Sequence, residues 1–95
     1  MIIASLSSVS SVAFASSKGI YGYKCIADGV NIRNAASTSA ASYGLILKGE
    51  MVYGGPDYKT PGWLYVHPAI ETVIYQTYGY DFYGYTYGIY YQEQL

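Results

Sequence analysis

Turn-forming residues interrupt this chain roughly every six to twelve residues, and the runs between them are rich in strand formers. Gly, Pro, Asp and Asn supply turn geometries, whereas Tyr, Val and Ile fit a pleated strand. Turns are predicted at 28–29, 48–50, 54–57 and 59–62, and a polar loop at 34–42. Strands are predicted at 23–27, 30–33, 42–47, 51–53, 63–67, 73–75 and 85–90. Short strands at this spacing predict one small all-β barrel or sandwich.

The first seventeen residues differ from the rest, because they combine apolar residues and serines without any charge. Ala13-Phe14-Ala15 has the small-x-small pattern of a signal-peptidase site. We therefore expect residues 1–17 to be an export signal, truncated at its start because no Lys or Arg precedes the apolar run. The alternative is a Ser-rich leader or a strand that pairs with a neighbour. Residues 18–22 are expected to be a junction, and residues 92–95 a tail.

The segment from Tyr75 to Tyr91 holds eight of the fourteen tyrosines. Alternating Tyr and Gly is typical of either a disordered, adhesive tract or a hairpin with one aromatic face. Tyr83, Tyr85 and Tyr87 are two residues apart, so a strand would place them on one face. Such a row serves either as core and solvent shielding or as a ligand platform, and the first interpretation is favoured.

Charge and reactive side chains exclude several functions. The five cations are scattered and the net charge is −1, so the clustered positive field that nucleic-acid binding needs is missing. No apolar run has the roughly 18–20 residues of a spanning helix. The single His67 and the dispersed carboxylates predict no metal site and no cofactor. The lone Cys25 is interpreted as a small buried hydrophobe, with an intermolecular crosslink or a reactive thiol as alternatives. We expect no catalysis.

Four motifs then occur in a recognisable order. They are Ala27-Asp28-Gly29-Val30-Asn31-Ile32-Arg33, the run from Gly44 to Val52 with its second glycine at Gly49, Gly62-Trp63-Leu64-Tyr65-Val66, and the run from Gly84 to Tyr91. Together they resemble the bacterial-type SH3 domains, over most of the chain from Tyr21 onward. The stretch from His67 to Tyr83 is longer than in that family, and the usual Gly-Pro after the first motif is missing.

The resemblance implies an SH3-like barrel of five to seven short strands over residues 23–91, closed by a Tyr/Gly-rich final hairpin. Its fold-defining residues would be Asn31, Arg33, Gly44, Gly49, Gly62, Trp63 and Gly84. Asn31 is expected to satisfy backbone groups while Val30 and Ile32 face inward. Trp63 is expected to contribute a large apolar surface to the core.

The function expected from this resemblance is a secreted or cell-wall-associated module that holds wall peptide or glycan in an aromatic groove. Its candidate ligand-binding residues are Tyr43, Tyr53, Asp57, Tyr58, Tyr65 and Tyr78. No membrane contact is expected once the signal is removed. A different class of function is a Tyr-rich structural subunit that self-associates through exposed strand edges into a coat, matrix or fibre. A secreted effector or inhibitor is a third, weaker alternative.

Overall fold

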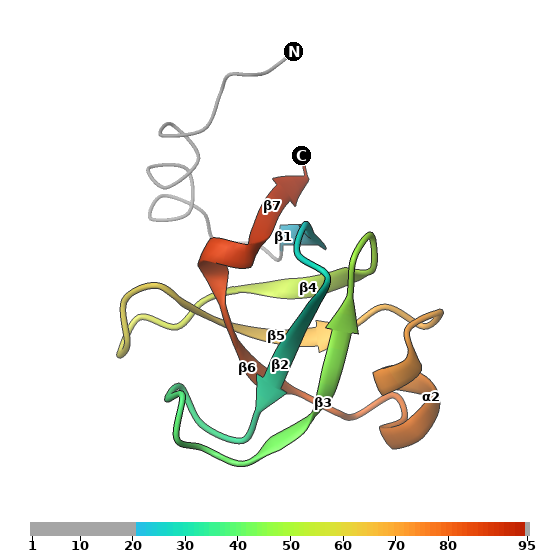
Figure 1. Cartoon of the computed structure of the whole chain (residues 1–95), viewed down its shortest axis with the longest axis horizontal. Helices are drawn as coiled ribbons and strands as arrows, with labels where there is room; N and C mark the ends of the chain where they lie inside the picture. The colour runs from blue at the N-terminus through green and yellow to red at the C-terminus, as the bar shows by residue number, and fades with distance from the viewer. Residues whose placement is uncertain (1–20, 95) are drawn as a thin grey trace.

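The computed structural model describes residues 21–94, which form seven strands, one short helix and one 3₁₀ turn (Figure 1). The predicted export signal at 1–17 lies outside these residues. The elements are β1 (Tyr21–Cys25), β2 (Gly29–Arg33), β3 (Ser42–Leu47), β4 (Met51–Pro56), β5 (Trp63–Pro68), α2 (Val73–Tyr78), β6 (Gly84–Tyr87), η1 (Gly88–Tyr90) and β7 (Tyr91–Gln94). The prediction of a small all-β domain is confirmed.

All seven strands belong to one sheet, in the order β3-β2-β6-β5-β4-β1-β7, and every neighbouring pair is antiparallel. β4, β5 and β6 form a meander, and β2 and β3 form a hairpin on one side of it. β6 joins that hairpin through the pair Arg33–Tyr85. After η1 the chain crosses back, and β7 pairs with β1.

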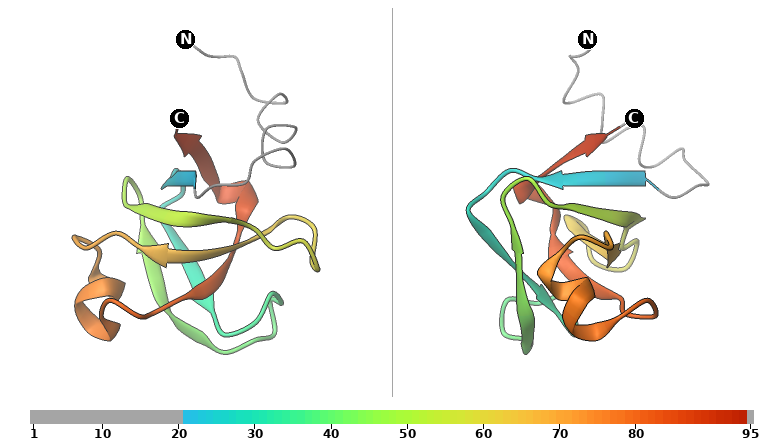
Figure 2. Two further views of the ribbon diagram at one scale, coloured as in Figure 1. Left: turned by 180° about the vertical axis from the view of Figure 1, so that it is seen from behind. Right: turned by 90° about the vertical axis from the view of Figure 1, so that its right-hand side faces the viewer.

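The sheet folds over one continuous apolar core. Ile46 of β3 and Tyr91 of β7 come from the two opposite edges of the sheet, yet both belong to the same buried cluster. The sulfur of Cys25 in β1 lies 3.6 Å from the carbonyl oxygen of Ile46. A flat sheet would hold these strands far apart, so the sheet must bend around its own interior, as the two views of Figure 2 show.

The predicted strand at 73–75 is wrong, because these residues begin the helix α2. The hydroxyl oxygen of Thr72 caps the helix by accepting a hydrogen bond from the backbone N–H of Tyr75 at 3.0 Å. Ile74 is the buried residue of α2, which packs against β3. The cap and this packing override the β preference of Val73 and Ile74. The helix occupies the insertion between His67 and Tyr83.

The expected final hairpin is also wrong. The segment from Tyr75 to Tyr91 forms most of α2, then β6, then η1. β6 pairs with β5 and β2, whereas β7 pairs with β1, so the last two strands are not paired with each other. Strand structure also begins two residues before the predicted domain, at Tyr21, and extends into the predicted tail, to Gln94.

The first motif forms β2, where Val30 and Ile32 face the core as predicted. Asn31 makes a different contact from the expected one. Its side-chain oxygen accepts a hydrogen bond from the hydroxyl of Ser42, at 2.7 Å, and not from a backbone group. Arg33 donates to the carbonyl oxygen of Ala40 at 2.9 Å, which holds the loop between β2 and β3.

Three of the four predicted glycines, Gly44, Gly49 and Gly62, have a positive φ angle. Gly49 shows why. It turns the chain from β3 to β4 with a φ of 90°, a backbone conformation that residues with a side chain rarely adopt. Gly84 is required for another reason: an added Cβ would lie 2.7 Å from Cγ1 of Ile32. Trp63 is buried but lies outside the continuous core, with its ring 5.3 Å from that of Tyr87.

Candidate functional site

The outer face of β5 and β6 is lined with aromatic rings. Along β5, Leu64 and Val66 are buried, while Tyr65 between them is exposed. Along β6, Gly84 and Thr86 are buried, and Tyr85 and Tyr87 point to the other side. This alternation follows from the period of two along a strand. It places Tyr85 and Tyr87 on one face that points away from the core. Tyr83, which precedes β6, lies on the same face because its ring stacks on that of Tyr65, so the prediction that the three share one face is confirmed.

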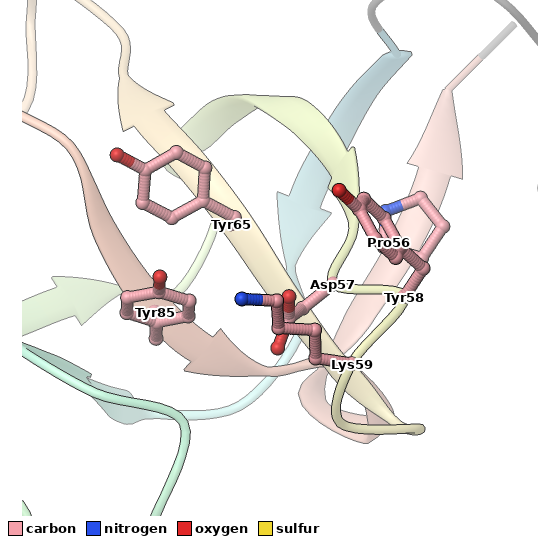
Figure 3. A pocket seen from close by; sticks show the side chains of 6 residues that line it. All are labelled: Pro56, Asp57, Tyr58, Lys59, Tyr65 and Tyr85. Atoms are coloured by element: carbon pink, nitrogen blue, oxygen red, sulfur yellow. The ribbon is translucent and has the colours of Figure 1, made fainter.

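A hollow of about 260 Å³ lies at one end of this outer face. Tyr65 and Tyr85 line it from β5 and β6, and the segment 56–59 lines it from the connection between β4 and β5 (Figure 3). Its volume is below the roughly 300–1,000 Å³ of sites that enclose a drug-sized molecule. The hollow is therefore too small to enclose a whole molecule of that size.

Backbone hydrogen bonds hold the loop that bounds the hollow. The N–H of Asp57 donates to the carbonyl oxygen of Trp63 at 2.8 Å, and the N–H of Thr60 donates to the carbonyl oxygen of Asp57 at 3.2 Å. Tyr58 stands on this loop with 92% of its surface exposed. In Figure 3 the side chains of Asp57 and Lys59 lie between the Tyr85 ring and the Pro56–Tyr58 side of the hollow.

The hollow carries one negative and one positive side chain beside its rings. Asp57 accepts hydrogen bonds, and Lys59 donates up to three. Tyr65, Tyr85 and Tyr58 each add an apolar ring with a hydroxyl that donates and accepts. Such a set fits a ligand that has apolar or ring surface together with amide, hydroxyl or charged groups. These side chains can contact such a ligand through many weak interactions.

The structure brings together three of the six predicted ligand-binding residues, Asp57, Tyr58 and Tyr65. The other three lie elsewhere. Tyr43 of β3 and Tyr78, the last residue of α2, form a separate cluster, in which the Tyr78 hydroxyl donates to the carbonyl oxygen of Tyr43 at 3.0 Å. Tyr53 lies on β4, paired across the strands with His67.

Sequence reasoning missed Pro56, Lys59 and Tyr85 as members of the hollow. Pro56 and Lys59 flank two predicted residues in the same loop, so their place was accessible from the sequence. Tyr85 was not, because its position depends on β6 pairing with β5, in the register Tyr65–Tyr85. The signal that pointed toward it was the period-two row of tyrosines.

A row of stacked and tilted rings extends from the hollow across the outer face. The ring of Tyr65 lies 4.8 Å from that of Tyr85 and 5.2 Å from that of Tyr83, measured between centroids. The ring of His67 continues the row at 5.4 Å from Tyr83. Nδ1 of His67 lies 3.2 Å from the carbonyl oxygen of Phe82, which only accepts, so Nδ1 carries the hydrogen.

Cys25 is fully buried in the core, as its interpretation as a small hydrophobe predicts. Its thiol donates to the carbonyl oxygen of Ala27 at 3.3 Å. Burial raises the pKa of this thiol, so the nucleophilic thiolate is disfavoured. His67 belongs to the opposite, outer side of the sheet. Within residues 21–94 no three His, Cys, Asp or Glu side chains gather in a way that would hold a metal ion.

In the part of the chain that the structure describes, no helix has the length and apolar character needed to cross a membrane. Comparison of the chain with protein-family models, with curated proteins and with solved structures gives no match.

Proposed function

We propose that this protein is a secreted, non-catalytic binding module that holds peptide or glycan of a cell wall in the hollow beside Tyr65 and Tyr85. The observation that carries the proposal is the convergence of three tyrosines, from β5, β6 and the connecting loop, on one open hollow that also holds two opposite charges. Stacking and multiple hydrogen bonds on an open surface suit one segment of an extended polymer.

The topology supports the SH3-like part of this proposal. A hairpin, β2–β3, lies between β1 and β4 in the chain, a meander follows, and a single 3₁₀ turn precedes the last strand, which returns to β1. The four motifs of the sequence fall on β2, on β3 with β4, on the start of β5, and on β6 with η1. We infer from this agreement that the curved sheet is an SH3-like barrel.

The first test is co-sedimentation with purified peptidoglycan, using Tyr58→Ala. Because Tyr58 is almost fully exposed, its removal leaves the fold intact and removes one wall of the hollow. We expect binding to weaken about tenfold, which corresponds to roughly 1.4 kcal/mol. Tyr80→Ala is the matched control, because Tyr80 is also highly exposed, at 74%, and lies outside the hollow.

Two results would contradict the proposal. One is that the wild-type chain sediments no more than an unrelated protein of similar size. The other is that both variants lose binding equally, which would indicate general adhesion of the tyrosine-rich surface.

The charges of the hollow separate a peptide ligand from a glycan. Lys59→Met removes the positive charge while keeping most of the aliphatic stem. Competition with soluble stem peptides and with soluble glycan fragments then distinguishes the two. If a peptide carboxylate binds Lys59, the variant loses affinity for the peptides alone, and the wild-type affinity falls with added salt.

Self-association into a coat or fibre remains a second candidate, because one observation favours it. β3 is an edge strand, and its outward residues Tyr43, Leu45 and Leu47 are all exposed. An apolar edge strand is a template for pairing with another chain. Light scattering at increasing concentration tests this, with Leu45→Lys against Gln92→Lys on the other edge strand, β7. A wild-type chain that stays monomeric at high concentration would remove this candidate.

A further inference from the structure

Two tyrosines of the outer face are held ring against ring while both remain accessible. Tyr65 belongs to β5, and Tyr83 directly precedes β6. Their ring centroids are 5.2 Å apart, and the ring planes differ by 22°. Each side chain keeps more than two fifths of its surface exposed, at 43% and 44%. Among the stacked ring pairs of residues 21–94, this is the one in which both members are tyrosines.

We propose that Tyr65 and Tyr83 form an oxidative coupling site, at which a haem peroxidase with hydrogen peroxide joins the two rings as dityrosine. Each phenol gives up one electron and one proton to the oxidised haem and becomes a phenoxyl radical. The radicals combine by forming a carbon–carbon bond between ring carbons next to the hydroxyls. The two rings then lose the hydrogens on those carbons as they regain both phenols. In sum, two phenols and one hydrogen peroxide give one dityrosine and two water molecules.

The geometry favours this pair over its neighbours. The ring of Tyr85 is also near Tyr65, at 4.8 Å, but it is tilted by 44° and only partly exposed. In the Tyr65–Tyr83 pair the ring planes differ by only 22° and both rings are exposed, so both phenols are open to the oxidant. Tyr58 and Tyr80 are more exposed, and Tyr80 has an edge-on contact with His67. Links through these two residues would join separate chains, so they depend on protein concentration.

The interior of the protein does not compete for the oxidant. A thiol is ordinarily the side chain that an oxidant attacks first, in proportion to its exposure and thiolate character. Cys25 is fully buried, and burial raises its pKa. Tyr23 and Tyr91 are also buried. Oxidising equivalents from a protein-sized enzyme therefore reach the outer face first.

The link would have a structural consequence. It would close a loop of chain from Tyr65 to Tyr83, and this loop contains α2. A covalent crosslink restricts the unfolded chain, in the same way as a disulfide does. The coupled protein should therefore unfold at a higher temperature than the uncoupled protein. Thermal unfolding of fractions that light scattering shows to be monomeric measures this difference.

The experiment oxidises the dilute chain with a haem peroxidase and hydrogen peroxide, then cleaves it after glutamate. Cleavage at Glu50, Glu71 and Glu93 places Tyr65 in the peptide 51–71 and Tyr83 in the peptide 72–93. We expect monomeric product in which these peptides are joined, with a mass two hydrogens below their sum. Fragmentation of the joined pair should place the link at Tyr65 and Tyr83.

Tyr83→Phe keeps the ring and removes the phenol, and we expect it to lower the yield of this intrachain link at least tenfold. Tyr65→Phe provides the second variant should the first perturb the fold, which circular dichroism reports. Tyr53→Phe is the matched control, since Tyr53 is on the same outer face and similarly exposed, and it should leave the yield unchanged. A dominant link at other residues, or an unchanged yield in both Tyr65→Phe and Tyr83→Phe, would overturn the assignment.

Discussion

The interior tyrosines, Tyr23 and Tyr91, and the outer-face tyrosines, Tyr58, Tyr65, Tyr83 and Tyr85, use the same side chain in two different ways. Tyr23 and Tyr91 are 1% and 8% exposed and belong to the core. The outer-face tyrosines contact one another or the hollow. This difference in burial shows that residue type alone does not decide the role of a tyrosine in this protein. Its place in the fold, on the inner or the outer side of the sheet or on a loop, decides that role.

Burial also changes the acidity of the interior tyrosines. It raises the pKa of Tyr23 and of Tyr91, because the charged tyrosinate loses its hydration. The hydroxyl of Thr86 donates to the carbonyl oxygen of Asn31, so its one hydrogen is used. The Tyr91 hydroxyl, 2.9 Å from the same Thr86 oxygen, must therefore be the donor in that bond.

The largest expected contrast is in stability. Tyr23→Ala should lower the free energy of unfolding by about 3–5 kcal/mol, because it removes a buried aromatic ring from the core. Tyr58→Ala should change it by less than about 0.5 kcal/mol, because the residue is exposed. Urea denaturation followed by circular dichroism measures both. Equal losses would mean that the two groups of tyrosines do not differ as described.

The next effect is the loss of stability at alkaline pH that the two interior tyrosines should cause. An ordinary tyrosine has a pKa near 10 in the unfolded chain. Because the folded pKa of Tyr23 and Tyr91 is raised, the native state keeps two protons that the unfolded state loses above about pH 10. The stability that these two tyrosines contribute should therefore be constant below pH 10 and fall as the pH rises further. An ultraviolet titration of tyrosinate with simultaneous circular dichroism should show these two ionising only as the protein unfolds.

Removing a single hydroxyl should give a smaller difference in stability between an interior and an outer-face tyrosine. Tyr91→Phe removes the hydrogen bond to Thr86 and should cost about 1 kcal/mol of stability. Tyr65→Phe, on the outer face, should be close to neutral in stability. Thermal unfolding of the two variants side by side measures the difference, and a loss of similar size in Tyr65→Phe would contradict it.

The smallest expected effect comes from Glu93, which lies opposite Tyr23 in the pairing of β1 with β7. Burial raises the pKa of this carboxyl, so the folded state prefers it neutral. The native state then holds a proton longer than the unfolded state, and stability falls as the pH rises past the unfolded pKa of about 4.3. Glu93→Gln should be more stable than the wild type at pH 7 and equal to it below pH 4. Melting curves at both pH values test the sign.

Local patterns predicted much of the strand structure and less of the site. β3 has the predicted bounds, and the turn at Gly49 and the buried Cys25 were also predicted. These features depend on neighbours along the chain, through turn geometry and the period of two. The helix α2 was not predicted, because its cap at Thr72 and the packing of Ile74 against β3 outweigh the propensity of two β-branched residues.

The sequence by itself determined that the chain forms short strands, and that Tyr83, Tyr85 and Tyr87 share a face, because turn signals and alternation along a strand are local properties. Only the tertiary structure decided which way that face points and which tyrosines meet. Tyr85 reaches the hollow with Asp57 and Tyr58 because β6 pairs with β5, whereas Tyr43 of β3 meets Tyr78 of α2 elsewhere. Strand pairing joins residues that are distant in the chain, so no window of neighbouring residues contains it.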